Sequence, residues 1–256
     1  MSQASHTIIG FYFPGKKSTV DHIYDHDFLG NFYSSPVTLT PPNQKKSQHF
    51  TNAEAAFQAL KDWSHVQEYI HLDGSAAFRL KRVAEKEGRT DRSYSGYGSN
   101  VAAMKDVLKS KFAQPELAAR LCETKNALLI EHNDVVGRDR FWSNNNDGTG
   151  KNMLGLLLME LRDVLAETSY TGTYLDNWKT LVYEGTQKIL AQVAARTPKS
   201  SCLYPGCDRE AWNGKRGFCS RSHRDAMCKQ CLTEFRYEKH DFCSRTCAQK
   251  YRKDHS

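Results

Sequence analysis

Residues 50–62, FTNAEAAFQALKD, form the segment on which the fold prediction rests, and they are expected to make one short helix. Thr51 is a favourable N-cap residue, and Glu54 three positions later completes a capping-box pattern. Ala53, Phe57 and Leu60 recur at helical spacing, so we expect them to form the stripe that packs into the core.

A second stripe on the same predicted helix carries polar side chains. Glu54, Gln58 and Lys61 repeat the spacing one residue later, so an acid, an amide and an amine share the neighbouring face. Two interpretations are open. Either Glu54 only caps the helix and Lys61 is a solvated charge, as is common on helices, or the three groups line a reactive site. Motifs elsewhere in the chain favour the second interpretation.

Strands and amphipathic helices are predicted on both sides of this segment. Strands are expected at 7–13 and 128–134, and helices at 75–87, 101–112, from Pro115 onward, 152–166 and 176–196. Ser34-Ser35-Pro36 has the composition of a turn, and 41–46, 88–100 and 137–151 have the composition of loops. The predicted fold class is α+β, with a predominantly helical main domain and a small sheet at 1–168, a helical extension and linker at 169–199, and a small C-terminal domain at 200–256.

Composition limits the classes of protein to which the chain can belong. Its 256 residues suffice for one sizeable core and a small second module, and 39% hydrophobic residues are typical of a folded protein. No apolar run approaches the roughly 20 residues that cross a bilayer, and the N-terminal sequence lacks the pattern of a secretory signal. We therefore expect an intracellular protein, cytoplasmic and/or nuclear, without a membrane partner.

The cysteines are concentrated at the C-terminal end. Seven of the eight lie between Cys202 and Cys247, in the spacing C-x4-C-x11-C-x3-H followed by C-x2-C-x11-C-x3-C. FCSRSH at 218–223 and FCSRTC at 242–247 form an internal repeat, which is typical of two tetrahedral zinc sites. The natural grouping of ligands is Cys202, Cys207, Cys219 and His223 at one site, and Cys228, Cys231, Cys243 and Cys247 at the other; a cross-braced pairing is the alternative.

These two zinc sites are predicted to be structural. All four ligands of each come from the protein, and a module of this size has few large apolar residues with which to fold without metal. From Ser200 onward there are 12 Lys/Arg against 7 Asp/Glu, but seven zinc-bound thiolates would leave a net charge of only about +2. The module is therefore compatible with contact to nucleic acid, with contact to protein, or with neither.

Four segments of the main domain occur in an order that resembles the NADAR family, which is named for its links to NAD and ADP-ribose and includes the bacterial YbiA proteins. They are FLGNFYSSPV (28–37), FTNAEAAFQALK (50–61), MKDVLKSKFAQPELAARLCET (104–124) and the segment 128–165. Within them the family's motifs are matched by Asn31-Phe32-Tyr33, Glu54/Gln58/Lys61, Lys111-Phe112, Glu131, Asp139/Trp142 and Asn152/Gly155. The resemblance spans roughly residues 8–166 and implies a YbiA-like fold.

The resemblance implies hydrolysis of an N-glycosidic bond between ribose and a base, without a catalytic cofactor. Lys61 would attack the anomeric carbon and hold the opened sugar as a Schiff base, provided that burial keeps its amine neutral. Glu54 would stabilise the developing positive charge, and Asp139 would support proton transfer. On an ideal helix Glu54 and Lys61 are about 10 Å apart along the axis, so we expect them to flank a sugar and not to pair.

Further residues are expected to contact the substrate. Aromatic stacking on a base is one role, electrostatic or polar contact with phosphate is another, and packing or turn chemistry is the alternative for each. Tyr97 lies where family members usually carry a tryptophan, and it is expected to supply an aromatic ring there. The predicted substrate-binding set is Asn31, Phe32, Tyr33, Gln58, Tyr97, Glu131, Arg140, Trp142, Gly150, Asn152 and Gly155.

The expected substrate is ADP-ribose attached to a guanine base, free or in nucleic acid. Two alternatives are open: an N-glycosidase of riboflavin-pathway intermediates, which is the other activity that the resemblance implies, and a non-catalytic protein that binds NAD or ADP-ribose.

Overall fold

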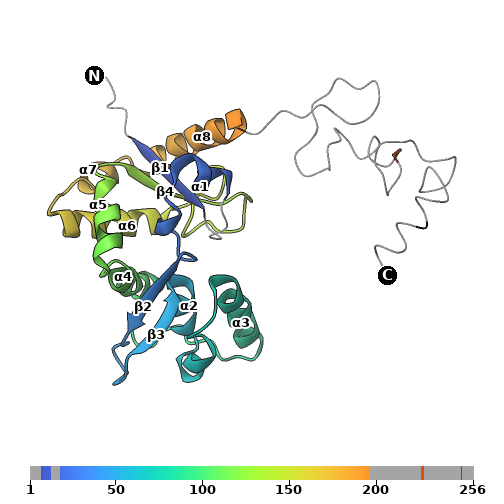
Figure 1. The fold of residues 1–256 in the computed structure, drawn as a ribbon, viewed down its shortest axis with the longest axis vertical. Helices are drawn as coiled ribbons and strands as arrows, with labels where there is room; N and C mark the ends of the chain where they lie inside the picture. The colour runs from blue at the N-terminus through green and yellow to red at the C-terminus, as the bar shows by residue number, and fades with distance from the viewer. Residues whose placement is uncertain (1–6, 13–17, 197–225, 228–248, 250–256) are drawn as a thin grey trace. The chain divides into compact units, whose positions relative to one another are not determined.

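The computed structural model describes residues 7–12, 18–196, 226–227 and 249. The chain divides into two compact units, Met1–Ala194 and Ala195–Ser256, and the helices and strands of Figure 1 begin in the first. In the described residues, no helix has both the length and the apolar character needed to cross a membrane. In chain order the elements are β1 (Ile8–Tyr12), α1 (Thr19–Tyr24), η1 (Asp27–Leu29), β2 (Ser34–Leu39), β3 (Gln48–Asn52), α2 (Ala53–Ala59), η2 (Trp63–Glu68), α3 (Gly74–Lys86), α4 (Asn100–Lys111), α5 (Pro115–Glu123), β4 (Leu128–His132), α6 (Met153–Ala166), α7 (Gly172–Leu175) and α8 (Trp178–Arg196).

Helix α2 is buried along its whole length and packs against β2, β3, α3 and α4 (Figure 1). Alanine occupies four of its seven positions, and these small side chains let the neighbouring elements approach closely. The predicted apolar stripe of Ala53, Phe57 and Leu60 is confirmed, since each is at most 3% exposed. Two residues of the polar stripe are buried too: Glu54 is 6% and Gln58 4% exposed, so Glu54 is not a solvated capping residue, while Lys61 is partly buried.

The predicted N-cap of this helix is wrong by one residue. Thr51 belongs to β3, and its hydroxyl donates to the Leu72 carbonyl. Asn52 is the N-cap instead: its side-chain oxygen accepts a 2.8 Å hydrogen bond from the Ala55 amide. Strand pairing continues up to Asn52, which leaves Thr51 extended and moves the start of the helix one residue along.

The strands form two separate two-stranded sheets. Strands β1 and β4 pair in parallel, with Ile8 opposite Leu128 and Tyr12 opposite His132. Strands β2 and β3 pair antiparallel, and the 41–46 loop joins them, as expected for an exposed connection. The predicted turn at 34–36 is wrong, because these residues begin β2. Pro36 lies at the register irregularity between Ser34 and Val37. The sheet does not need a hydrogen bond from a backbone N–H there, so proline is tolerated.

The remaining helices follow the predicted periodicity. The helices expected at 75–87, 101–112 and 152–166 are confirmed as α3, α4 and α6, and Pro115 begins α5. Helix α8 packs directly on the β1–β4 sheet, since a Cβ placed on Gly185 would lie 2.5 Å from the Ile130 side chain. Much of the segment that we separated as an extension, 169–199, therefore shares the core of the first unit.

Candidate active site

A cavity of about 130 Å³ opens where α2, α3, α4, β4 and two loops meet. Its volume is well below that of a site for a drug-sized ligand and suits one sugar ring. Eight residues of the predicted set line it, together with four others. The twelve are Asn31, Phe32, Glu54, Phe57, Gln58, Lys61, Phe78, Lys81, Met104, Glu131, Asp139 and Trp142.

The polar stripe of α2 forms a hydrogen-bonded row along this cavity. The Lys61 ammonium donates to Gln58 Oε1 at 2.9 Å, and Gln58 Nε2 donates to Glu54 Oε1 at 2.7 Å. The amide therefore bridges the amine and the carboxylate, which do not pair directly. One helical face thus presents a nucleophile and an acid to the same cavity, held apart by a group that bonds to both.

The surroundings of Lys61 favour its neutral, nucleophilic form. Its Nζ lies 4.6 Å from the centre of the Phe57 ring and 5.8 Å from that of Tyr94, contacts that attract the ammonium form, but two other effects oppose that form. Burial, followed by repulsion from the Lys81 ammonium, lowers the pKa of Lys61 from 10.5 to about 8. A lysine amine with a pKa near neutrality is a competent nucleophile toward a carbon that carries positive charge.

Three carboxyl groups face the same cavity, which makes protonation of at least one of them favourable. Burial raises the pKa of Glu54, against the hydrogen bond from Gln58 and the charge of Lys61. The pKa of Glu131 is raised well above its ordinary value, first by burial and then by repulsion from Asp139 and Glu54. Burial thus favours the protonated form of Glu131, which is the form that a general acid needs.

Two buried oxygens at the cavity lack partners within the described part of the chain. They are Oε2 of Glu131 and Oδ1 of Asn31, on residues that are 2% and 7% exposed. A buried polar atom without a partner costs about 1–3 kcal/mol, so such atoms are usually paired. Because both residues line the cavity, a bound polar ligand would provide the missing hydrogen bonds.

Comparison with known proteins identifies the domain that carries this cavity. A family model described as "NADAR domain" matches residues 12–166, which is more than half of the chain. The chain belongs to the NADAR family. The match includes every residue of the cavity, from Asn31 to Trp142.

The relatives of this chain differ in how much of their own length the match covers. "Riboflavin biosynthesis protein VVA0006" of Vibrio vulnificus is 34% identical over 73% of this chain, but the chain spans only 50% of that relative. "N-glycosidase YbiA" of Escherichia coli is 33% identical over 62% of this chain and 89% of its own length. The NMR structure of E. coli YbiA is 31% identical, with a TM-score of 0.49, and covers 64% of this chain and 88% of its own.

Several residues predicted to contact the substrate lie outside the cavity and instead hold the backbone around it in place. Asn152 Oδ1 accepts from the Glu131 amide at 2.9 Å, and its Nδ2 donates to the Leu129 carbonyl at 2.8 Å, so this side chain fixes β4 under the cavity. Gly150 and Gly155 allow close backbone approaches, because a Cβ on either would lie 2.1–2.2 Å from a carbonyl oxygen. The structure thus gives these three residues a part in local packing.

Tyr33, Tyr97 and Arg140 are likewise absent from the cavity lining. The Tyr97 hydroxyl donates to Asp106 on α4, and the ring packs against the core. Tyr33 lies over the buried Lys111 ammonium, 5.8 Å from Nζ to the ring centre. Arg140 accepts a backbone hydrogen bond from Lys151.

The loop expected at 137–151 is ordered by its own asparagines. Asn144 and Asn145 are fully buried, and Asn144 Nδ2 donates to Thr186 on α8 at 3.0 Å. Asp139 Oδ1 accepts from the Phe141 and Trp142 amides, at 2.8 and 2.9 Å. Trp142 then packs edge-on against Phe57, with 5.5 Å between ring centres. The loop therefore delivers Asp139 and Trp142 to the cavity from a fixed scaffold.

Four lining residues were not predicted as site residues. Phe57 and Met104 read as core positions in the sequence, and each is indeed buried at the cavity wall. Phe78 and Lys81 are one helical turn apart on α3, and only the packing of α3 against α2 brings them to Lys61. Their spacing shows that they share one face of a helix, but it does not show which other element that face packs against.

The fully buried Lys111 holds another part of the wall. Its Nζ donates to the Gly30 carbonyl at 2.8 Å, directly before Asn31. Burial, opposed by Asp27, lowers the pKa of this ammonium to about 7. Lys111 thereby ties α4 to the segment that presents Asn31 and Phe32.

A wider, open cavity of about 560 Å³ adjoins the small one. The two share Lys61 and Lys81, and the outer one adds Arg92 and the start of α4 at Ser99 and Asn100. A ligand with its sugar at Lys61 can therefore extend outward past Arg92 and the Lys81–Glu85 ion pair. All eight predicted zinc ligands lie outside the described residues.

Proposed function

We propose that the NADAR domain of this chain hydrolyses the N-glycosidic bond between a ribose and a base. The observation that carries the proposal is the row Lys61–Gln58–Glu54 on a cavity that suits one sugar ring. The YbiA relatives are named N-glycosidases, which supports the same reaction class.

The proposed first step is attack by the neutral Lys61 amine on the anomeric carbon. The new C–N bond forms as the bond to the base breaks, and the base leaves with a proton from a carboxyl group of the site. Glu131 is the proposed donor because burial raises its pKa well above the ordinary value and its Oε2 has no hydrogen-bond partner among the described residues. Glu54 stabilises the positive charge at the sugar, and Asp139 assists proton transfer.

The proposed second step releases the sugar. Transfer of a proton to the ring oxygen opens the glycosyl-lysine to a protonated Schiff base. Water adds to the imine carbon, and expulsion of the amine restores Lys61 and gives the free sugar aldehyde, which closes again. One water is consumed for each bond cleaved, and no electrons are transferred.

We propose ADP-ribose linked to a guanine base as the preferred substrate, free or in nucleic acid. Arg92 lines the outer cavity, and so does Lys81, which is ion-paired with Glu85; these two cations are the groups proposed to contact a diphosphate next to the sugar. The second candidate is a riboflavin-pathway intermediate, which is favoured by the printed name of the Vibrio vulnificus relative.

The test compares the two substrates on one preparation. Purified full-length protein is incubated with ADP-ribosyl-guanosine and, separately, with a phosphoribosyl riboflavin-pathway intermediate, and released base is measured by chromatography. The proposal predicts a kcat/KM at least about tenfold higher for ADP-ribosyl-guanosine. A preference for the second substrate would replace the first. Tight ADP-ribose binding without turnover of either, unchanged by Lys61→Ala, would indicate a non-catalytic binding protein.

A separate proposal concerns residues 200–256. We propose that two Zn²⁺ ions fold this segment through Cys202, Cys207, Cys219, His223, Cys228, Cys231, Cys243 and Cys247, with nucleic acid or protein as its contact. The repeated ligand spacing supports it.

A further inference from the structure

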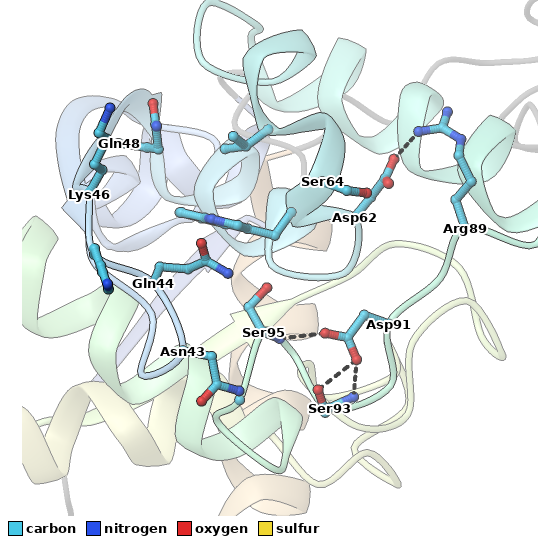
Figure 2. Close-up of a pocket in the computed structure, with 14 residues that line it drawn as sticks. Asn43, Gln44, Lys46, Gln48, Asp62, Ser64, Arg89, Asp91, Ser93 and Ser95 are labelled. Carbon is cyan, nitrogen blue, oxygen red and sulfur yellow. Dashed lines mark hydrogen bonds and ion pairs between the residues drawn. The ribbon is translucent and has the colours of Figure 1, made fainter.

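A third cavity, separate from the catalytic one, lies between the β2–β3 hairpin and the 89–96 loop. It is an open groove of about 810 Å³, and Trp63 and Ser64 at the start of η2 contribute to its wall. Figure 2 shows Gln44, Lys46 and Gln48 coming from the hairpin, and Asp91, Ser93 and Ser95 from the loop. Nothing in the proposed glycosidase mechanism uses these side chains.

The two carboxylates of the groove are already bonded within its walls. Asp62 accepts from His65 Nδ1 at 2.8 Å and is paired with Arg89 (Figure 2). Asp91 accepts from the Ser93 amide and hydroxyl, each at 2.7 Å, and from the Ser95 amide at 2.8 Å. These hydrogen bonds, led by that of the Ser93 side chain, lower the pKa of Asp91. Arg89 therefore offsets the charge of Asp62, whereas Asp91 stays ionised and is held within its own loop by these hydrogen bonds.

The groups left available in the groove are cationic, amide and aromatic. Lys45 and Lys46 are exposed, and neither has an ion-pair partner within the described residues. Asn43 and Gln44 add side-chain amides, and the partly exposed Trp63 adds a ring. Ammonium groups beside an aromatic surface are the pattern by which proteins bind single-stranded nucleic acid: the charges follow the phosphates and the ring stacks on a base.

The groove is connected to the catalytic lysine through the 89–96 loop. The Asp91 amide donates to the Lys61 carbonyl at 2.6 Å, and the Ser95 hydroxyl donates to the Leu60 carbonyl at 3.0 Å. Asp91 also lines the outer cavity that contains Lys61 and Lys81. The groove, the outer cavity and the sugar-sized cavity thus follow one another along the surface.

We propose that this groove binds the phosphodiester backbone of single-stranded nucleic acid next to the modified base. The part of the proposal that places the strand beside a modified base rests on the proposed function. An acidic peptide is the other polyanion to consider, and the groove favours nucleic acid because Trp63 and the amides match bases as well as phosphates.

The first experiment measures binding without any reaction. A fluorescently labelled, unmodified single-stranded oligonucleotide is titrated with full-length protein at several salt concentrations, and Kd is obtained from anisotropy. The test variant is Lys45→Ala/Lys46→Ala. The matched control is Lys179→Ala/Lys188→Ala, which removes the same charge from exposed positions on α8, at the far end of the domain from the hairpin (Figure 1).

The proposal predicts a shallower salt dependence for the groove variant alone. Two lost phosphate contacts should reduce the slope of log K against log salt by about 1.4, with Kd about tenfold weaker at low salt. The control should keep the wild-type slope. Equal slopes in all three proteins, or a stronger effect of an acidic peptide competitor than of an unlabelled oligonucleotide, would overturn the proposal.

The second experiment separates this inference from the proposed function. The ratio of kcat/KM on an ADP-ribosylated oligonucleotide to that on ADP-ribosyl-guanosine should fall at least about fivefold in Lys45→Ala/Lys46→Ala and stay constant in the control. One outcome is that the wild type cleaves neither substrate while the salt dependence of oligonucleotide binding still depends on Lys45 and Lys46. In that case the proposed function is wrong and the proposed binding groove is supported. If both substrates are cleaved with an unchanged ratio, the groove fails and the proposed function stands.

Discussion

Lys61 is the residue whose protonation state decides whether the cavity can form a covalent intermediate. With a pKa lowered to about 8, the amine loses its proton as the pH rises through that value. We therefore predict that kcat climbs with pH, is half-maximal near pH 8 and levels off about one pH unit higher for as long as Glu131 keeps its proton, measured as a pH–rate profile. A profile that is flat from about pH 6 to about pH 9 would contradict a neutral amine as the reacting group.

The matching control at this position is Lys61→Arg, which preserves positive charge but has no neutral form near physiological pH. It should lose at least about 10³-fold in kcat, in common with Lys61→Ala. Retention of activity by Lys61→Arg would show that the positive charge, and not the free amine, is what the reaction needs.

Glu131 gives a second prediction at the residue scale. Its raised pKa means that glutamine, which mimics the protonated carboxyl in shape and neutrality, should fit without loss of stability. Glu131→Gln should nevertheless lower kcat by about 10²-fold or more, because the amide has no acidic proton to give to the leaving base. The melting temperature and kcat of this variant are measured together. Unchanged kcat would remove Glu131 as the proton donor.

The sequence indicates part of this site because part of it lies on one helix. Glu54, Gln58 and Lys61 share a face by spacing alone, and the structure places all three at the cavity. Phe78 and Lys81 come from α3, so their contribution depends on tertiary packing that no local pattern specifies. Tyr97 shows the opposite case, since its position in the motif order predicts a contact residue, but it is absent from the cavity lining and bonds to Asp106.

At the scale of elements, the start of α2 provides a stability test. Asn52→Ala removes the cap of the Ala55 amide and the hydrogen bond to the Leu72 carbonyl, so we predict a loss of about 1–2 kcal/mol in the free energy of unfolding. Thr51→Ala removes an exposed bond to the Leu72 carbonyl and the bond that the Thr51 hydroxyl accepts from Asn52 Nδ2, whose other bonds remain, and should cost about 0.5 kcal/mol. Urea unfolding of both variants checks the order. A larger loss for Thr51→Ala would support the capping box predicted at Thr51 over the Asn52 cap seen in the structure.

Strand pairing explains why element boundaries were the less predictable part of the fold. The helices at 74–86, 100–111 and 153–166 each carry their own apolar period, so their existence follows from local sequence. The pairing of Ser34 with Asn52 is a long-range event, and it converts both the predicted turn at 34–36 and the predicted cap at Thr51 into strand. Likewise, the parallel pairing of β1 with β4 joins segments more than one hundred residues apart.

At the scale of the whole molecule, we predict that the NADAR domain remains folded and active when zinc is removed from the C-terminal segment. Elemental analysis should find about two Zn²⁺ per chain, from the spacing of the eight C-terminal ligands. A strong chelator should release them and unfold residues 200–256 while the NADAR domain keeps its melting transition and its turnover of a free nucleoside. One cooperative collapse of both units on chelation would refute this two-domain prediction.

Covalent trapping tests the central claim of a Schiff base on Lys61 most directly. The protein is mixed with ADP-ribose, reduced with borohydride and analysed by intact-protein and peptide mass spectrometry, beside Lys61→Ala and Lys81→Ala. We predict one stable adduct on the wild type and on Lys81→Ala, located in the peptide that contains Lys61, and none on Lys61→Ala. An equal adduct on Lys61→Ala, or no adduct on a wild-type preparation that turns over substrate, would contradict the covalent mechanism.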